Sequence, residues 1–448
     1  MRIPEAPPGR QAILEELVRL GTERLVKLLG MQWGPEVEGR YLHWDELRRH
    51  PAPEGLTHRE WWLLVAQGRN ALRTELPLPD NQGRAFSYTR PDSLLEGLHR
   101  IDRGLGNHLE ATEPHLVNKD VRDHYIIRSL MEEAITSSQL EGASTTRKVA
   151  KDMLLQNRPP RTKGERMILN NFQAMELLRR RVQEPLSIRF LLELHETLTT
   201  GTLDSEDEVG RLRHRDEVIT VLDRGDGEVL HIPPDADELP SRLRQLCAFA
   251  NEESAQVFIH PVVRAISLHF ALAYEHPFVD GNGRTARALF YWSMLRQGYW
   301  IAEFLSISRI IQRAPVKYSR AFLFTETDGG DLTYFLLNQL EVIHHATDDL
   351  YKYLDRKSRE VGQVDQLLRG DDSFNHRQRA LLAHALRHPT ARYDIQSFQK
   401  QHAVVYQTAR QDLLDLERAG LLKKTRIGRA FSFIPAPGLQ QLLKRLRA

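Results

Sequence analysis

Apolar residues recur at helical spacing through the middle of the chain. The segments Pro185–Thr199, Val262–Glu275 and Thr285–Gln297 carry apolar side chains at intervals of three and four residues, which is typical of helices that bury one or more faces. Gly298 follows the last segment, at the position where glycine commonly ends a helix. We therefore predict that residues 116–350 fold mainly into long helices.

One β-hairpin is predicted to interrupt these helices. Glu217–Leu222 and Glu228–Ile232 are rich in β-branched residues, and they flank the sequence Asp223-Arg-Gly-Asp-Gly227, whose residues suit a tight turn. Pro233 and Pro234 come next. They should end the second strand, because proline cannot donate a ladder hydrogen bond.

The N-terminal region, residues 1–115, is also expected to be helical. Its clearest helical pattern runs from Ala12 to Leu29. Four tryptophans follow, which we interpret as core or docking anchors without chemistry of their own: Trp33, Trp44, Trp61 and Trp62.

The C-terminal part divides into a charged segment, residues 351–372, which is either a linker or a helix end, and a domain at residues 373–448. The pattern of that domain predicts three helices, a stop at Gly420 and two strands: Asn375–Arg387, Ile395–His402, Val405–Ala419, then Leu421–Leu422 and Ala430–Ile434. This order is typical of a winged helix-turn-helix. The expected fold is therefore mainly α, with a helical core, one hairpin and a C-terminal winged helix.

Composition narrows the class of protein. A chain of 448 residues is too long for one core, so two or three domains are expected. The net charge of +2 gives no overall field toward nucleic acid or membrane. Cys247 is the single cysteine and has apolar neighbours, which predicts a buried, unreactive thiol. Neither a signal peptide nor a run of about 18 apolar residues is recognisable, so we expect a cytoplasmic protein without a membrane partner.

The chemistry is concentrated in His276-Pro-Phe-Val-Asp280-Gly-Asn-Gly-Arg284-Thr-Ala-Arg287, between two predicted helices. Gly281 and Gly283 allow positive φ and a close approach of the backbone to a ligand. Amides at a helix start have no intrahelical partner and attract anions. Arg284 and Arg287 share one helix face and add two guanidinium groups, which suit phosphates.

Two further residues of this stretch suit group transfer. Asp280 is a hard oxygen ligand for Mg²⁺, which proteins often hold with one or two carboxylates plus substrate phosphates. His276 can titrate near neutral pH and act as a general base. A phosphate grip, a metal ligand and a base so close together indicate nucleotide-dependent group transfer. The spacing matches neither a P-loop nor the protein-kinase motifs.

The stretch resembles the signature of the Fic family, His-x-Phe-x-(Asp/Glu)-Gly-Asn-Gly-Arg-x-x-Arg, at every specified position. The neighbouring helices and hairpin resemble the core of that family over residues 116–350. The resemblance implies a protein adenylyltransferase, which moves AMP from ATP to a Tyr, Thr or Ser hydroxyl of a protein and releases pyrophosphate.

The resemblance also implies a role for each matching residue. His276 would deprotonate the target hydroxyl, Asp280 would hold Mg²⁺ against the α- and β-phosphates, and Phe278 would pack beneath the loop. The remaining residues would bind phosphates, the first three as an anion hole and the last two at the β- and γ-phosphates: Gly281, Asn282, Gly283, Arg284 and Arg287.

A second motif, Ser137-Ser-Gln-Leu-Glu141-Gly142, ends a helical run that begins at Asp123. It resembles the inhibitory pattern of the family, (Ser/Thr)-x-x-x-Glu-(Gly/Asn). Ser137 and Glu141 are four residues apart and face the same way, and Gly142 can end the helix. The resemblance implies that Glu141 lies against Arg287 and keeps ATP from placing its α-phosphate in line for attack. It leaves open whether the protein also removes AMP.

The predicted hairpin, Glu217–Pro234, resembles the flap of the family. Its exposed edge would hold a target segment by main-chain pairing at six positions: Val218, Ile219, Thr220, Leu230, His231 and Ile232. Such pairing depends little on which side chains the target segment carries. The target therefore stays open, including the protein itself, and so does a homodimer.

An alternative function is a nucleotide-responsive DNA-binding regulator whose Fic core senses ATP without turnover. Residues 420–448 contain seven Lys or Arg and no Asp or Glu. The wing and recognition helix would contact DNA through basic and polar residues: Lys423, Lys424, Arg426 and Arg429, then Tyr406, Gln407, Thr408 and Arg410. Winged helices also serve in dimerisation and protein docking, which stays open here.

The intact base at His276 favours the enzyme over the sensor, because a sensor has no need of it. A third alternative is transfer of another group, such as UMP or phosphate. Asp280, Asn282 and Arg284 favour the usual orientation of ATP.

Overall fold

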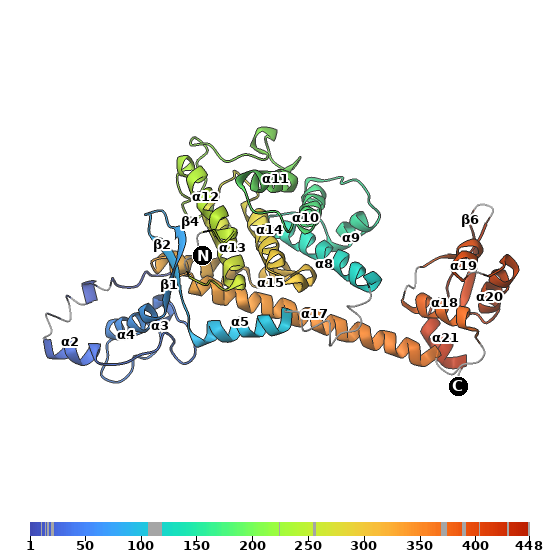
Figure 1. Ribbon diagram of the computed structural model, residues 1–448, viewed down its shortest axis with the longest axis horizontal. Helices are drawn as coiled ribbons and strands as arrows, with labels where there is room; N and C mark the ends of the chain where they lie inside the picture. The colour runs from blue at the N-terminus through green and yellow to red at the C-terminus, as the bar shows by residue number, and fades with distance from the viewer. Residues whose placement is uncertain are drawn as a thin grey trace. The chain divides into compact units, whose positions relative to one another are not determined.

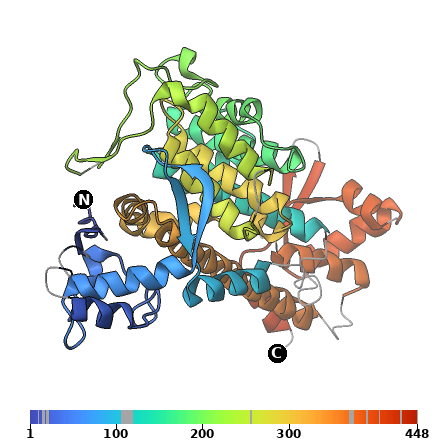
Figure 2. The same ribbon diagram turned by 60° about the vertical axis from the view of Figure 1, so that its left-hand side comes forward.

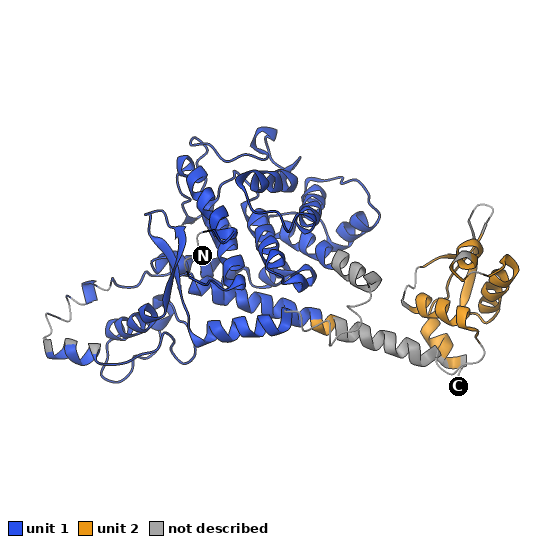
Figure 3. Ribbon diagram, in the orientation of Figure 1, with its two compact units in different colours: residues 1–350 blue, residues 351–448 orange. Residues whose placement is uncertain are grey.

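The structure is a computed structural model of the chain. It describes all residues except 10, 14, 16–17, 19–21, 106–118, 224, 254–256, 369–373, 388–390, 403, 428–429 and 447–448. The chain divides into two compact units, residues 1–350 and 351–448 (Figure 3). The boundary predicted at residues 115–116 lies outside the described residues.

Helices dominate the first unit (Figure 1), and the prediction of a mainly helical fold is confirmed. The N-terminal part contains α2 (Thr22–Leu29), α3 (Trp44–Leu47), α4 (His58–Ala71) and α5 (Asp92–Leu105). The central part contains α8 (Lys119–Leu140), α9 (Arg147–Leu155), α10 (Lys163–Arg180), α11 (Ile188–Thr199), α12 (Leu239–Ala250), α13 (Pro261–Glu275) and α14 (Asn282–Arg296). It ends with α15 (Ile307–Arg313), α16 (Pro315–Thr327) and α17 (Thr333–Leu368).

Side-chain caps explain why several of these helices begin where they do. The hydroxyl oxygens of Thr57, Thr162 and Ser187 accept hydrogen bonds from the third backbone amides of α4, α10 and α11. Such caps satisfy amides that a helix cannot bond itself. Gly298 has a φ of 86° directly beyond α14 and its cap, as the sequence predicted.

The centre of the first unit is the antiparallel pair α13 and α14, which run side by side in Figures 1 and 2. Nearly every residue of both helices is buried. A helix surrounded on all sides needs small or apolar side chains on every face, which explains why their sequences are not amphipathic. The loop between these helices therefore has a rigid support on both sides.

The N-terminal region is not wholly helical, which corrects the sequence prediction. Arg73–Pro79 (β1) and Ala85–Thr89 (β2) form an antiparallel hairpin. The signal was present in the alternation of buried Leu76 and Leu78 with exposed residues. The four tryptophans do belong to or pack against one apolar core, together with parts of α2, α3 and α4.

The predicted flap hairpin is much shorter than expected. Its strands are limited to Val221–Leu222 (β3) and Val229–His231 (β4), so the prediction of a strand over Glu217–Thr220 is wrong. Glu217 instead pairs with Arg211 at 2.6 Å and accepts the backbone N–H of His214 at 2.6 Å. These bonds fold the chain into a turn just before β3.

The charged segment at residues 351–372 continues a helix as far as the structure describes it. α17 extends through Leu368, and residues 369–373 lie outside the described part. Residues 351–368 are therefore helical, and the role of the segment as a linker or a helix end stays a prediction.

The second unit contains four helices and a small sheet in its described part. They are α18 (His376–Arg387), β5 (Tyr393–Asp394), α19 (Ile395–His402), α20 (Tyr406–Arg418), β6 (Leu422–Ile427), β7 (Ala430–Pro435) and α21 (Leu439–Leu446). The strands pair antiparallel in the order β5-β7-β6. A separate apolar core includes Leu382, Leu413 and Phe433. The winged-helix assignment itself stays a prediction.

Two other sequence expectations can be compared with the structure. Cys247 is buried in α12, and burial raises the pKa of its thiol to about 12. Within the described residues, no helix combines the length and apolar character needed to cross a membrane.

Candidate functional site

The loop between α13 and α14 is held in one conformation by its own side chains. His276 ends α13 with a φ of 43°, in the left-handed region that few non-glycine residues adopt. Gly281 has a φ of 86° immediately before α14. The Asn282 side chain accepts the backbone N–H of Phe278 at 3.0 Å and donates to the Phe278 carbonyl at 2.8 Å. These two hydrogen bonds close the loop into a rigid turn.

Phe278 is fully buried beneath the loop and stacks on His195 of α11, with ring centroids 3.7 Å apart. His195 donates from Nε2 to the carbonyl of Asp280 at 2.9 Å and accepts the N–H of Gly210 at its Nδ1. Burial lowers the pKa of His195 to about 4, which keeps the ring neutral. His195 was not among the predicted site residues, because a lone histidine on an apolar helix gives no signal of a distant partner.

The geometry of His276 suits a general base. Its Nδ1 lies 2.9 Å from the carbonyl of Ala273, which can only accept, so Nδ1 carries the proton. The Nε2 atom is then the nitrogen that can take a proton. Burial lowers the pKa of His276 below its ordinary value, so the neutral ring persists at neutral pH.

Arg284 is a buried cation with an incomplete set of partners. Its side chain is fully buried, and its Nη1 donates to the carbonyl of Leu198 at 3.0 Å. Its Nε and Nη2 make no hydrogen bond to the described residues, and Nη2 approaches the carboxylate of Asp280 only to 3.5 Å. Buried donors are rarely left without acceptors, so this guanidinium is suited to receive an anion.

Arg287 lies one turn further along α14 and is bonded to Ser137 of α8 and to Glu141, which follows α8. Its Nε donates to Ser137 Oγ at 2.9 Å, and its Nη2 donates to the Ser137 carbonyl at 3.1 Å and to Glu141 Oε1 at 2.9 Å. A Cβ atom at Gly283 would lie 2.2 Å from Glu141 Oε1. The Glu141 carboxylate therefore rests on the first turn of α14. The next residue, Gly142, has a φ of 97°.

These residues surround one cavity of about 260 Å³. Six of the predicted site residues line it, from the loop, α14 and the residue after α8: His276, Asp280, Asn282, Gly283, Arg287 and Glu141. Arg284 lies beneath this wall and is not among the lining residues.

The opposite wall of the cavity comes from the flap and α16. Val221, Leu230 and His231 line it from the flap, and Phe322 and Leu323 line it from α16. Of the six predicted flap residues, only two reach the cavity. The others lie outside it, with Val218 and Ile232 strongly exposed at 84% and 64%.

His231 fixes the flap to the core. Its ring lies 2.7 Å from Glu326 Oε2 through Nδ1 and 2.7 Å from the Tyr274 carbonyl through Nε2. Both partners are acceptors, so this ring binds β4 to α16 and to the end of α13. His231 was predicted to lie on the target-binding edge, but its side chain points inward and is buried.

Asp280 is the carboxylate that fits a magnesium ion. Its side chain is 56% exposed at the mouth of the cavity. No group of three or more metal-ligating side chains occurs in the part of the chain that the structure describes. One exposed carboxylate beside a phosphate site fits Mg²⁺, which completes its shell with phosphates and water, and does not fit a cation held by protein alone.

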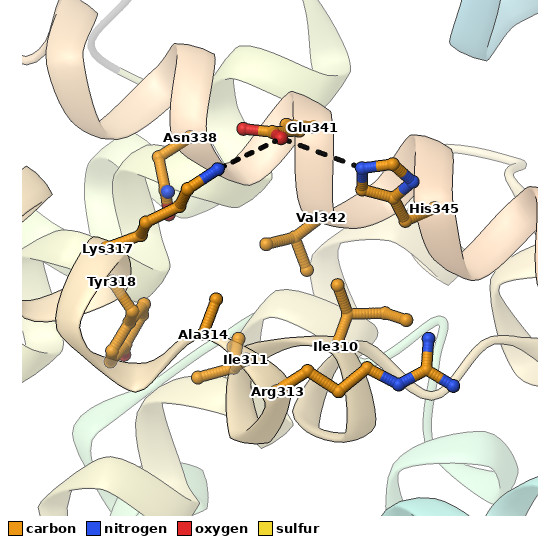
Figure 4. Close-up of a pocket in the computed structure, with 10 residues that line it drawn as sticks. All are labelled: Ile310, Ile311, Arg313, Ala314, Lys317, Tyr318, Asn338, Glu341, Val342 and His345. Atoms are coloured by element: carbon orange, nitrogen blue, oxygen red, sulfur yellow. Dashed lines mark ion pairs between the residues drawn. The ribbon is translucent and has the colours of Figure 1, made fainter.

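A second cavity of about 260 Å³ lies between α15, α16 and α17 (Figure 4). Its floor is apolar, with Ile310, Ile311 and Val342. Glu341 on its rim pairs with both Lys317 and His345 at 3.6 Å. Because Lys317 already pairs with Glu341 on this rim, it attracts anions less than the incompletely bonded Arg284 does.

Comparison with known proteins agrees with this geometry. The profile of the Fic/DOC family matches residues 185–294, which include α11, the flap and the loop at His276. Protein adenylyltransferase Fic of Drosophila sechellia is 41% identical over 69 residues, and that of Aedes aegypti is 39% identical over 69 residues. Each match covers 15% of this chain and only 14% of the relative.

A solved structure extends the likeness in fold. The crystal structure of a Fic family protein from Desulfovibrio desulfuricans G20 aligns with 78% of this chain and 97% of its own, with a TM-score of 0.53 and 19% identity. At this identity the likeness concerns the fold alone. Together with the match of residues 185–294 to the Fic/DOC family, it shows that this chain contains a Fic/DOC domain with a Fic-type fold.

Proposed function

We propose that this protein is an adenylyltransferase that transfers AMP from ATP to a Tyr, Thr or Ser hydroxyl of a protein. The observation that carries the proposal is the buried guanidinium of Arg284, which has two nitrogens without hydrogen bonds in the described part of the chain. It lies one turn from Arg287 and close to a histidine base. A polyanion would satisfy these donors.

The proposed reaction is a substitution at the α-phosphorus of ATP. The target oxygen attacks phosphorus while its proton passes to Nε2 of His276. The bond between the α-phosphorus and the bridging oxygen breaks, and pyrophosphate leaves with that electron pair. The products are the AMP ester of the protein and pyrophosphate. Positioning and charge neutralisation supply most of the catalysis in such transfers.

Different residues of the site would bind different parts of ATP. Arg284 and the amides at the start of α14 would hold phosphates, and the apolar wall with Leu230 and Phe322 suits a nucleobase. Asp280 would hold Mg²⁺, which supplies neutralisation of phosphate charge when bound.

Glu141 would restrain the reaction. Its carboxylate rests on Gly283 and occupies Arg287, which the γ-phosphate would otherwise reach. If about 1% of molecules have Glu141 displaced, the restraint corresponds to ~2.7 kcal/mol. One substitution can remove an interaction of this size, so Glu141→Gly should raise AMP transfer by up to about 100-fold.

The test is intact-mass measurement after incubation with ATP and Mg²⁺. It compares the unchanged protein, Glu141→Gly, and Glu141→Gly combined with His276→Ala, each with and without a mixture of candidate protein targets. We expect added AMP units in the single variant that disappear in the double variant. A mass gain corresponding to UMP or phosphate with other nucleotides, or no gain with any of them, would contradict the proposal.

The flap would hold the target beside His276. The exposed side chains of Val218 and Ile232 flank its short strands. We propose main-chain pairing along this edge, although the hairpin offers a shorter edge than the sequence suggested.

We also propose nucleic-acid binding by the second unit as a separate candidate function. Lys423, Lys424 and Arg410 are exposed, and Tyr406 at the start of α20 is 48% exposed. Arg429 lies outside the described residues. Fluorescence anisotropy with duplex DNA at several salt concentrations tests this, since phosphate contacts give a steep salt dependence. An affinity that does not change with salt would rule it out.

A further inference from the structure

The helix that carries Ser137 also carries a buried acid on the same face. Glu133, Ser137 and Glu141 are spaced by four residues, so they follow one another along α8 and its end. Glu133 is only 2% exposed, and the proposed chemistry does not use it. A buried carboxylate is costly unless its oxygens accept hydrogen bonds, so its partners indicate what it does.

Glu133 accepts hydrogen bonds from the segment that begins α15, and its carboxylate also interacts with Tyr291 and Arg287 of α14. Its Oε1 accepts the hydroxyl of Ser308 at 2.5 Å, and its Oε2 accepts the hydroxyl of Ser306 at 2.9 Å and the backbone N–H of Ser308 at 3.1 Å. One turn nearer to Glu141, Thr136 Oγ1 lies 3.3 Å from Ser306 Oγ. Both carboxylate oxygens are therefore satisfied, and both depend on α15.

This dependence couples the two helices. Burial raises the pKa of Glu133, and the hydrogen bond from Ser308, the charge of Arg287 and the hydrogen bond from Ser306 oppose that rise. If α8 rotated or slid away from α15, the carboxylate would lose these donors while the rest of the helix still excluded water. Leaving a buried acceptor without partners is strongly unfavourable. The bond network therefore favours one register of α8 against the core.

The neighbouring acid on α8 has a different set of partners. Glu132 pairs with Arg147 at 2.5 Å and with Lys151 at 3.1 Å, and both belong to α9. Glu132 thus holds α9 to α8, whereas Glu133 holds α8 to the core. The two residues differ by one position and have the same side chain, which makes Glu132 a matched control.

We propose that Glu133 is a positioning residue that fixes α8 in the register at which Glu141 meets Arg287. The two glutamates are eight positions apart, which corresponds to about 12 Å of helix, and α8 ends at Leu140, just before Glu141. A displacement at Glu133 is passed along this rigid segment to Glu141. The inference rests on the proposed function, because the restraint by Glu141 is what Glu133 would support.

The test compares Glu133→Gln with Glu132→Gln in the full chain by two measurements. Hydrogen exchange followed by mass spectrometry reports the peptide that covers residues 134–142. We expect Glu133→Gln to speed exchange there by about tenfold, because local opening becomes more frequent. It should also raise AMP transfer by about fivefold or more, as a weakened restraint releases more molecules. Glu132→Gln should change neither the exchange of this peptide nor the transfer.

A double variant separates a positioning role from a merely structural one. Glu133→Gln combined with Glu141→Gly should be no more active than Glu141→Gly alone, because no restraint is left to weaken. The milder Ser308→Ala removes one donor and should change exchange and transfer in the same direction by a smaller factor. It keeps the proposal testable if Glu133→Gln does not fold.

Two results would overturn the proposal: unchanged exchange of residues 134–142 in both Glu133→Gln and Ser308→Ala, or equal activation by Glu133→Gln with and without Glu141. Failure of the proposed function gives a different pattern. In that case Glu141→Gly transfers no AMP to any target, while the exchange measurement still decides whether Glu133 positions α8.

Discussion

Arg284 and Arg287 lie three residues apart on α14, yet their surroundings differ sharply. Arg287 is bonded to Ser137 and Glu141, whereas Arg284 has one hydrogen bond, to the carbonyl of Leu198. A buried charge with unfilled hydrogen-bonding capacity destabilises the folded state. The site thus combines Arg284, which has unfilled hydrogen-bonding capacity, with Arg287, which already binds a carboxylate.

The first prediction concerns Arg284→Met. Replacing the incompletely paired cation with an apolar side chain of similar length should stabilise the fold by about 1 kcal/mol or more. The same change should lower AMP transfer by about 100-fold, measured in the Glu141→Gly background. Thermal unfolding and transfer rates provide the two measurements.

Arg287→Met is the matched control for this experiment. It breaks the bonds to Ser137 and Glu141, so it should lower the melting temperature. A lower melting temperature for Arg284→Met as well would show that Arg284 is a structural residue rather than a receptor for an anion.

The second prediction is the pH dependence of transfer. Burial lowers the pKa of His276 from its ordinary 6.5, and the charge of Glu141 acts in the opposite direction. Only the neutral ring accepts a proton, so the base form is lost as pH falls through the lowered pKa. In Glu141→Gly the rate should stay level through pH 6.5 and fall tenfold per unit only below the lowered pKa. An acid limb centred above pH 6.5 would show that His276 is not the titrating base.

Among the elements, the β1–β2 hairpin supports the site from outside the loop between α13 and α14. Arg242 of α12 pairs with Glu275, the residue before His276, and donates to the carbonyl of Pro79 in β1 at 2.7 Å. At the tip of the hairpin, Asn81 donates from its backbone to the Tyr274 hydroxyl at 3.0 Å and from Nδ2 to the Ile232 carbonyl at 2.8 Å. The hairpin therefore holds both the end of α13 and the base of the flap.

The third prediction is that Asn81→Ala loosens the flap. The side-chain bond to Ile232 is lost and the backbone bond to Tyr274 remains, so the KM for ATP should rise about threefold while kcat changes little. Hydrogen exchange at residues 229–233 should increase. The exposed neighbour Gln82 provides the control, since Gln82→Ala should change neither quantity. An effect of Asn81→Ala on kcat alone would place its role at the catalytic loop instead of the flap.

At the scale of the whole molecule, the described residues of the candidate site all belong to the first unit, residues 1–350. The second unit has its own apolar core around Leu382 and Leu413. A unit with its own core and its own site can fold and act alone. α17 crosses the division between the units, so a cut inside this helix would remove part of its packing.

The fourth prediction follows from this division. A chain shortened after Leu368 keeps all of α17 and should transfer AMP within about twofold of the full-length rate, both measured with Glu141→Gly. Cooperative thermal unfolding of the shortened chain serves as the control for its fold. A folded fragment without activity would show that the second unit takes part in the reaction.

Features that depend on neighbouring residues could be predicted from the sequence. Helical periodicity located α11, α13, α14 and α19 to within a few residues, and glycines at positive φ marked the turns at Gly142, Gly281 and Gly298. The base, the carboxylate and the two arginines could be recognised together because they lie within twelve residues. Local geometry alone places such residues close together.

Tertiary structure decided every feature that needs a distant partner. Ser308 lies 175 residues from Glu133, and His195 lies far from Phe278, so no local pattern pairs them. The length of the flap depended on the bonds that Glu217 makes with Arg211. The unequal pairing of Arg284 and Arg287 depended on where α8 meets α14. Burial and hydrogen-bond satisfaction are properties of the packed chain, and they separate residues that the sequence presents as equivalent.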